Sequence, residues 1–330
     1  MARRLTYRRA ATVVAVALML ACASLLVACG GSSGGSGGSG GSGIPGGSGD
    51  PNSGESTTSG PAYSVPGSVA LVTFNEGAAQ TGNECAIDTS QLAQGVVGAS
   101  ARSDARLKFQ VVKGEMSYNY DLPGDGTPII VPINMGDGPY TFRVMQNTSG
   151  NNYVELFNVI ENVNLSSETA PFLVPNMFVN YNESSAVVAK ARELAQGAAN
   201  QGDVVRNIYQ WVVDNITYDH DKAAQLASAT GYVPDPDATL ASGTGICFDY
   251  ASLGAAMLRS LGIPCQVITG YVSPDDVYHA WNMVYIDGEW ISVEISIKPN
   301  SWTRVDLTFA ASGAASTIGD GTSYTDRYTY

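Results

Sequence analysis

The chain has 330 residues, of which 44% are hydrophobic and 14% are charged. This length and apolar content fit a globular protein of one large domain or two modest ones, and exclude a chain that is disordered throughout. The formal net charge of −13 at pH 7 disfavours a nucleic-acid partner, because phosphate binding requires a basic surface.

The first 28 residues have the layout of an export signal. Four arginines, at positions 3, 4, 8 and 9, precede an apolar stretch over 10–28. L-V-A-C at 26–29 resembles a bacterial lipobox, in which Cys29 becomes the lipidated first residue of the mature protein. An uncleaved membrane anchor is the alternative, because the apolar stretch is almost long enough to span a bilayer. A lipoprotein is preferred, and either form places the rest of the chain outside the cytoplasmic membrane, at the cell surface.

Residues 29–62 are composed mostly of Gly and Ser. Such a segment cannot bury a hydrophobic core and behaves as a flexible tether. We therefore predict a linker between the membrane anchor and the folded part of the chain.

A β-rich domain is predicted over 63–170. Its short apolar or alternating runs are separated by Gly-containing turn signals, as in a small β-sandwich. This region shows no catalytic constellation, and a role in binding carbohydrate or peptide stays open. The predicted strands are 69–74, 107–112, 116–120, 129–133, 140–145 and 153–159.

Helices are predicted from Pro175 onwards, in a second domain over 171–330. Apolar residues recur at helical spacing over 184–196 and 203–215, and Asp203 fits the N-cap of the second helix.

The next motif, G-T-G-I-C-F-D-Y-A at 243–251, carries the candidate nucleophile. It places Cys247 directly after a Gly-containing turn and at the start of an apolar helical run. Backbone N–H groups and the dipole at a helix N-terminus favour the thiolate form of a cysteine. Asp249 lies in the first turn of the same helix, where a carboxylate is favourable, and we expect it to be structural.

A thiolate nucleophile needs an imidazole that holds it as an ion pair and then protonates the leaving amine. The chain has only two histidines. His279 stands in Y-H-A-W-N, at the head of a predicted strand that follows another strand over 266–272. His220 lies among charged residues at a predicted helix end, where we expect a surface side chain. His279 is therefore the predicted partner of Cys247.

The motifs around these two residues resemble the transglutaminase-like superfamily, whose members share a papain-like Cys-His-Asp triad. The I-T-Y-D segment at 216–219 and the segment 231–240 resemble the approach to the nucleophile in this family. The matching motifs are G-x-C-x-D-Y-A at 245–251, L-R-S-L-G-I-P at 258–264, G-Y at 270–271 and H-A-W-N-x-V-Y-I-D-G-x-W at 279–290.

The resemblance implies an α+β fold in which helices pack against an antiparallel sheet, and Cys247 faces His279 and an acid on neighbouring strands. It indicates a bacterial lipoprotein subgroup with an N-terminal β-rich domain ahead of the transglutaminase-like catalytic domain.

Two residues fit the family spacing for the acid of the triad, a Trp followed four residues later by a carboxylate. Glu294 ends W-I-S-V-E, and a hairpin turning at Asp287-Gly288 would fold it back beside the His279 strand. Asp306 ends W-T-R-V-D, and the D-L-T-F that it begins resembles the D-P-T-F of the lipoprotein subgroup. Asp306 is preferred, and Glu294 stays as the alternative.

Two aromatic residues are candidates for substrate binding. Trp281 either walls the cleft or fills the core. Tyr232 is a weak candidate for the side chain that, with the backbone N–H of Cys247, holds the oxyanion. Of the other cysteines outside the signal, Cys265 is expected in the core, and Cys85 is either a free thiol or the partner of another chain.

These features predict an extracytoplasmic, lipid-anchored cysteine enzyme that acts on amide bonds of a protein or peptide, including a cell-envelope component. Cys247 would form a thioester, and water or an amine would accept the acyl group, with hydrolysis preferred. No cofactor is expected, and no motif suggests a metal site. The alternatives are a non-catalytic surface binding or adhesion protein that retains the triad, and self-acylation of Cys247 within its own chain.

Overall fold

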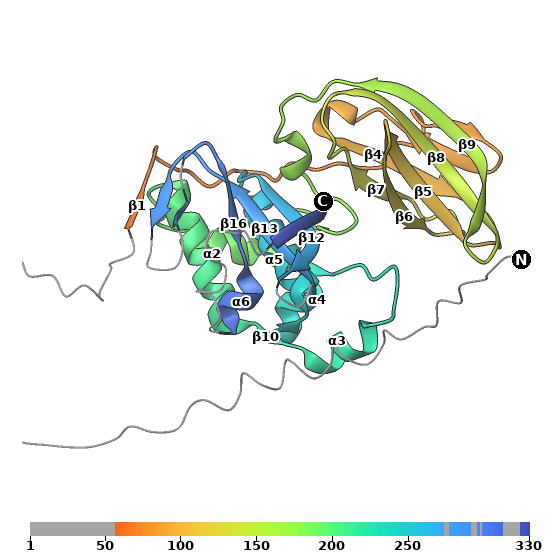
Figure 1. The fold of residues 1–330 in the computed structure, drawn as a ribbon. Helices are drawn as coiled ribbons and strands as arrows, with labels where there is room; N and C mark the ends of the chain where they lie inside the picture. The colour runs from red at the N-terminus through yellow and green to blue at the C-terminus, as the bar shows by residue number, and fades with distance from the viewer. Residues whose placement is uncertain (1–56, 274–276, 292–295, 298, 313–323) are drawn as a thin grey trace, which may run out of the picture. The chain divides into compact units, whose positions relative to one another are not determined.

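The computed structural model describes residues 57–330, except for 274–276, 292–295, 298 and 313–323. The predicted signal segment, Cys29 and Glu294 therefore lie outside the described residues. Residues 55–330 form a single compact unit. The architecture is mixed, with β-sheets first and helices with a further sheet after them, so the predicted α+β class is confirmed (Figure 1).

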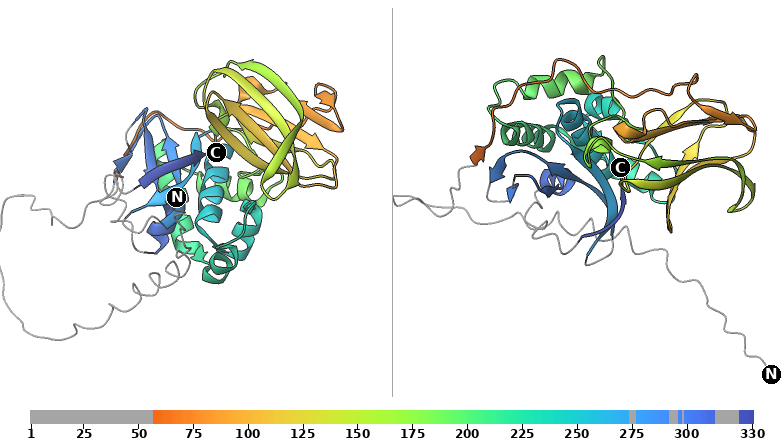
Figure 2. Two further views of the ribbon diagram at one scale, coloured as in Figure 1. Left: turned by 45° about the vertical axis from the view of Figure 1, so that its right-hand side comes forward. Right: turned by 90° about the horizontal axis from the view of Figure 1, so that it is seen from above.

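Two four-stranded antiparallel sheets make up the β-rich part, and they lie face to face in both views of Figure 2. The first has the order β2-β3-β4-β7 and the second the order β6-β5-β8-β9. Their strands are β2 (Gln80–Gly82), β3 (Cys85–Asp88), β4 (Val96–Ala101), β5 (Leu107–Lys113), β6 (Met116–Leu122), β7 (Ile129–Pro132), β8 (Gly138–Ser149) and β9 (Asn152–Val163).

Alternation of apolar and polar residues explains the sandwich. Leu107, Phe109 and Val111 of β5 are buried while the residues between them are partly exposed, as a strand with one face on a core requires. Five predicted strands correspond to β5 through β9. The predicted strand over 69–74 is wrong, because this segment runs outside both sheets, and β2, β3 and β4 were missed because their small residues give no strong alternation.

The second part is built around α5 (Cys247–Ser260), whose residues are all buried from Asp249 onwards. A helix that is buried on every side is mostly apolar, and α5 is rich in Ala and Leu, while its buried Asp249 and Arg259 are hydrogen-bonded. Further helices pack around it. They are α1 (Ala186–Leu194), α2 (Gln201–Asn215), α4 (Pro236–Ser242) and α6 (Leu307–Ala311). The short helix α3 (His220–Leu226) has no buried residue. The 3-10 turns η1 (Leu92–Gln94) and η2 (Ala170–Phe172) lie elsewhere in the chain.

An antiparallel sheet of order β16-β13-β12-β17 packs on α5. Its strands are β12 (Cys265–Val272), β13 (Val277–Tyr285), β16 (Trp302–Val305) and β17 (Tyr324–Thr329). Two small sheets complete the fold, β1 (Thr57–Ser59) with β14 (Glu289–Ile291) and β15 (Ser296–Ile297), and the parallel pair β10 (Thr217–Tyr218) and β11 (Thr244–Gly245).

The pairing of β14 corrects one prediction. The strand after the Asp287-Gly288 turn does not fold back on β13, because β14 pairs with β1 and β15 instead. The neighbours of β13 are β12 and β16. β1 itself falls inside the segment 29–62 that was predicted to be a flexible linker.

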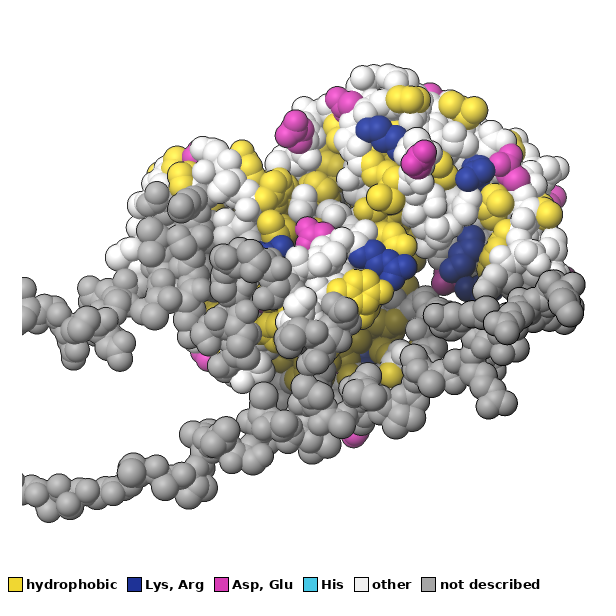
Figure 3. All heavy atoms as spheres, viewed as in Figure 1, with side chains coloured by type: hydrophobic (Ala, Val, Ile, Leu, Met, Phe, Trp, Pro, Cys, Tyr) yellow, Lys and Arg dark blue, Asp and Glu magenta, His cyan; other side chains and the backbone are white. Residues whose placement is uncertain are grey.

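Two further features concern the helices and the surface of the described residues. No helix within the described residues is long and apolar enough to cross a membrane. On the face drawn in Figure 3, basic side chains are scattered among acidic and apolar ones rather than gathered in one basic field.

Candidate active site

Cys247 is the first residue of α5 and is half-buried. It lines a pocket of about 350 Å³ together with His279 and Tyr218. The backbone N–H groups in the first turn of a helix have no partner within the helix, so they point their partial positive charge towards this end. The thiol therefore lies where a developing negative charge is stabilised.

Asp249 fixes the start of this helix. Its carboxylate, fully buried, accepts a hydrogen bond from the backbone N–H of Ile246 at 2.9 Å and from Lys222 Nζ at 2.7 Å, and a third from the Tyr232 hydroxyl. A side chain at Gly245 would collide with it, since a Cβ there would lie 2.7 Å from the Asp249 Cβ. These contacts hold the residue before Cys247 in one backbone position.

His279 and Asp306 form a buried pair. The imidazole Nε2 lies 2.8 Å from Asp306 Oδ2, and the two side chains are 6% and 0% exposed. Antiparallel pairing of β16 with β13 brings them together, because Val305 stands opposite Asn282 and the chain then turns towards His279. Since Asp306 engages Nε2, Nδ1 is the nitrogen left to face Cys247.

The charge state of His279 follows from these neighbours. Burial lowers its pKa, but the Asp306 carboxylate and Cys247 raise it by more, and the net effect raises the pKa to about 10. The imidazole is then protonated at neutral pH and is able to hold a thiolate as an ion pair.

Asp306 is itself held by three donors. Besides His279, the Tyr324 hydroxyl donates to Oδ2 at 2.9 Å and the backbone N–H of Phe309 donates to Oδ1 at 3.0 Å. Asp306 is thus also the N-cap of α6. Tyr324, in β17, was missed by sequence reasoning, because nothing local to the segment 324–329 connects it to Asp306.

Two aromatic rings lie beside the imidazole. Phe309 stacks on it with ring centroids 4.6 Å apart, and the centroid of Trp281 lies 6.2 Å away in a nearly parallel ring. Trp281 is only 1% exposed and does not line the pocket. Of the two roles left open by the sequence, the structure gives Trp281 the core position, so its assignment to substrate binding is corrected.

Tyr232 lines the pocket, as expected, but its hydroxyl is directed at Asp249. Burial and the hydrogen bond to this carboxylate raise the pKa of Tyr232 to about 12. Because its proton is used in that bond, Tyr232 is not suited to hold an oxyanion, and the prediction of that role is corrected.

Tyr218 is the better-placed hydroxyl. It lines the same pocket as Cys247, and its pKa is raised by burial and by the charge of Cys247. Its hydroxyl has no hydrogen-bond partner among the described residues. The sequence offered only its place in I-T-Y-D, ahead of the Cys247 turn, as a signal.

The remaining candidates do not line this pocket. His220 is exposed at the start of α3, not at a helix end. Cys85 and Cys265 are both buried free thiols, and burial raises the pKa of Cys265 to about 12. No group of three His, Cys, Asp or Glu side chains in the described part of the chain could hold a metal ion.

Comparison with known proteins identifies the central region. Residues 188–295 match the model of the Transglutaminase-like superfamily, so the chain carries a transglutaminase-like domain. This region begins within α1 and extends past β14, includes Cys247 and His279, and ends before Asp306.

Two curated relatives match about a third of the chain. Cytokinesis protein 3 of Schizosaccharomyces pombe is 33% identical over 120 residues, which are 32% of this chain and 12% of that protein. Kyphoscoliosis peptidase of Mus musculus is 31% identical over 112 residues, 31% of this chain and 16% of that protein. The chain thus spans less than a fifth of the length of either relative.

Among solved structures, the chain is similar to red sea bream transglutaminase, with 13% identity and a TM-score of 0.27 over 64% of this chain and 48% of that one.

Proposed function

We propose that this protein is a cysteine enzyme that acts on amide bonds, with Cys247 as the nucleophile, His279 as the general acid and base, and Asp306 as the residue that orients the imidazole. The supporting observation is the buried His279–Asp306 hydrogen bond beside a pocket that Cys247 also lines. The match of 188–295 to the transglutaminase-like model supports the same reading.

In the first step, the Cys247 thiolate attacks the carbonyl carbon of an amide. The C–N bond then breaks, the imidazolium of His279 gives its proton to the departing amine, and a thioester remains on Cys247. The tetrahedral intermediate carries a negative oxygen, for which the Cys247 backbone N–H and the Tyr218 hydroxyl are the proposed donors.

In the second step, neutral His279 takes a proton from the acyl acceptor, which attacks the thioester carbon and releases the Cys247 thiolate. With water as acceptor the product is a carboxylic acid, and with an amine it is a new amide. We favour water, because Cys247 is half-exposed and water is the acceptor that is always present.

The predicted site of action rests on the sequence before residue 57. The export signal and the lipobox at Cys29 support a lipid-anchored enzyme outside the cytoplasmic membrane, with a protein or peptide of the cell envelope as substrate. The Gly/Ser-rich linker would let the enzyme reach substrates away from its anchor.

The test is the rate at which iodoacetamide alkylates Cys247 in the fragment 55–330, followed by peptide mass mapping between about pH 5 and 9. Cys85 and Cys265 serve as internal references, since both are buried. We expect alkylation of Cys247 to persist at about pH 6, where an ordinary thiol is almost wholly protonated.

His279→Ala should lower the rate at about pH 6 at least about tenfold, because the thiolate loses its counter-ion. Asp306→Asn should shift the profile in the same direction, and Glu294→Gln is the matched control. A Cys247 that reacts only at alkaline pH, and equally in His279→Ala, would overturn the proposal and favour a binding protein with a vestigial triad.

A further inference from the structure

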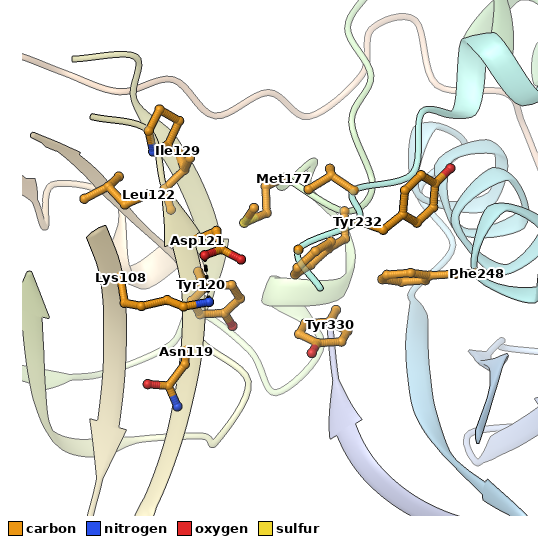
Figure 4. Close-up of a pocket in the computed structure, with 14 residues that line it drawn as sticks. Lys108, Asn119, Tyr120, Asp121, Leu122, Ile129, Met177, Tyr232, Phe248 and Tyr330 are labelled. Atoms are coloured by element: carbon orange, nitrogen blue, oxygen red, sulfur yellow. Dashed lines mark ion pairs between the residues drawn. The ribbon is translucent and has the colours of Figure 1, made fainter. Parts of the chain in front are cut away.

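A second pocket, of about 610 Å³, lies beside the candidate active site (Figure 4). In Figure 4, Lys108, Tyr120 and Leu122 of the β-rich part line one side of it, and Tyr232 and Phe248 line the other. Its volume lies within the range of pockets that bind small molecules or side chains.

This pocket adjoins the active-site pocket. Tyr232, Phe248 and Tyr330 line both of them. Phe248 directly follows Cys247 in α5, so one residue that lines the second pocket is the sequence neighbour of the candidate nucleophile. A chain with an amide bond at Cys247 therefore has this pocket within reach of its neighbouring residues.

One part of the pocket wall is aromatic and apolar, and Lys108, Asn119 and Asp121 form a polar part. Phe178 packs against Tyr330 and Phe248, with ring centroids 4.5 and 5.5 Å apart, and Met177 and Ile129 add aliphatic surface. Aromatic faces of this kind bind aromatic and other bulky apolar groups well.

The charged groups at this pocket neutralise one another. Lys108 Nζ lies 2.7 Å from Asp121 Oδ1, as the dashed line in Figure 4 marks. Lys108 and Asp121 are already paired with each other, so neither is free to pair with a charged side chain that enters the pocket. Such a side chain would lose its water without gaining an ion pair, which is costly. Val233, an apolar residue on the rim, is 41% exposed and would be covered by an occupant.

We propose that this second pocket is a specificity subsite that binds an uncharged aromatic side chain of a polypeptide substrate, close in sequence to the amide bond attacked by Cys247. The β-rich part then helps to select the substrate instead of binding a separate partner. This inference rests on the proposed function of Cys247.

The test uses two electrophiles that carry phenylalanine on opposite sides of the reactive carbon, N-acetyl-phenylalanyl-glycyl chloromethyl ketone and N-chloroacetyl-phenylalaninamide. Alanine and glutamate versions of each are compared on the fragment 55–330. At least one phenylalanine probe should alkylate Cys247 about tenfold faster than its alanine and glutamate counterparts, because burial of the ring adds affinity.

Val233→Trp should remove this preference by filling the pocket. Val154→Trp, at a similarly exposed valine of β9 that lines neither pocket, is the matched control and should keep it. The subsite would be overturned if the phenylalanine, alanine and glutamate versions of both electrophiles reacted at equal rates. If alkylation by iodoacetamide still depended on His279, the proposed enzyme would stand. Loss of the iodoacetamide reaction would instead count against the proposed enzyme.

A second measurement does not depend on Cys247. In a fragment with ¹³C-labelled methionine methyl groups, N-acetyl-phenylalaninamide should shift the NMR signal of Met177, which lines the pocket, and leave that of Met116, which is exposed on β6. N-acetyl-glutamate amide should shift neither. A Met177 signal that phenylalanine leaves in place, or that both compounds move equally, would contradict the inference.

Discussion

At the scale of single residues, the buried imidazole of His279 is the most constrained group of the site. Asp306 holds its Nε2, and the rings of Phe309 and Trp281 lie beside it. Tyr324 in turn bonds Asp306, so that neither member of the pair is able to turn away without breaking a hydrogen bond. Such an arrangement fixes the direction in which Nδ1 points, as a proton shuttle requires.

The raised pKa of His279 predicts a pH-dependent stability. Because the folded-state pKa of about 10 exceeds the ordinary value of 6.5, the stabilising contribution is fully present below about pH 6.5 and is lost as the pH rises towards 10. We compare the variant Cys247→Ala with the double variant Cys247→Ala, Asp306→Asn. The difference in their unfolding free energies should shrink as the pH rises above about 6.5, because Asp306 then raises the pKa of His279 without the help of Cys247. Urea titrations at several pH values measure it, and the Cys247→Ala background removes the thiol beside His279. A difference that stays constant with pH would contradict this account.

Tyr218 allows a test that separates two steps of the chemistry. Tyr218→Phe should lower the rate of acyl transfer from p-nitrophenyl acetate about a hundredfold, because a donor to the oxyanion is lost. Alkylation by iodoacetamide forms no oxyanion and should change less than about threefold. Stopped-flow release of p-nitrophenol and mass mapping measure the two rates. Equal losses in both would mean that Tyr218 acts on the thiol or on folding instead.

At the scale of elements, the site depends on how closely α5 approaches β13 and α6. Gly254 of α5 makes this approach possible, because a Cβ there would lie 2.5 Å from Leu307 Cδ1 and 3.2 Å from Asn282 Oδ1. Asn282 stands in β13 with His279, and Leu307 follows Asp306. One glycine therefore sets the spacing of the three elements that carry the proposed triad.

Gly254→Val should destabilise the fold by about 1–3 kcal/mol through overpacking. It should also weaken the dependence of Cys247 alkylation on His279, because α5 is pushed from β13. Gly67→Val is the control, since a Cβ at Gly67 has nothing within 4 Å. Denaturant unfolding and the alkylation profile measure the two effects. A variant that loses stability but keeps the full His279 dependence would show that the elements adjust without moving the site.

At the scale of the whole molecule, one buried cation joins segments that are distant in sequence. Arg259 is 1% exposed and donates to the backbone oxygens of Cys265 at 2.8 Å, Val174 at 3.0 Å and Tyr330 at 2.8 Å. Val174 lies between the β-rich part and α1, and Tyr330 follows β17. Arg259 thus connects α5, the sheet beside it and the segment that leads in from the β-sandwich.

Arg259→Met should cost about 3 kcal/mol or more, because the buried carbonyl groups of Cys265 and Val174 lose a charged donor and Tyr330 loses one of its two. Arg192→Met is the matched control, since its 2.9 Å ion pair with Glu183 is partly exposed, and it should cost less than about 1 kcal/mol. Chemical denaturation of the fragment 55–330 measures both. Equal costs would show that water or neighbouring donors replace the guanidinium.

The strands with strict alternation, the helices α1, α2 and α5, and the family resemblance around Cys247 and His279 were predicted from the sequence alone, whereas the short helices α3, α4 and α6 were not. Each predicted feature is a local property, since alternation, helical spacing and a thiol at a helix start involve residues near one another in the chain. The weak strands β2 to β4 were not visible, because their small residues are placed by the partner sheet and not by local propensity.

The neighbours of His279 were decided only by the tertiary structure. The sequence left Asp306 and Glu294 open, and the hairpin argument favoured the wrong strand for β13, because β14 pairs with β1 from more than two hundred residues earlier. Trp281, Tyr232 and Tyr324 likewise take their roles from partners on distant elements. The sequence determined which side chains are able to do the chemistry. Long-range strand pairing decided which of them come into contact, because the pairing of strands depends on burial across the whole fold.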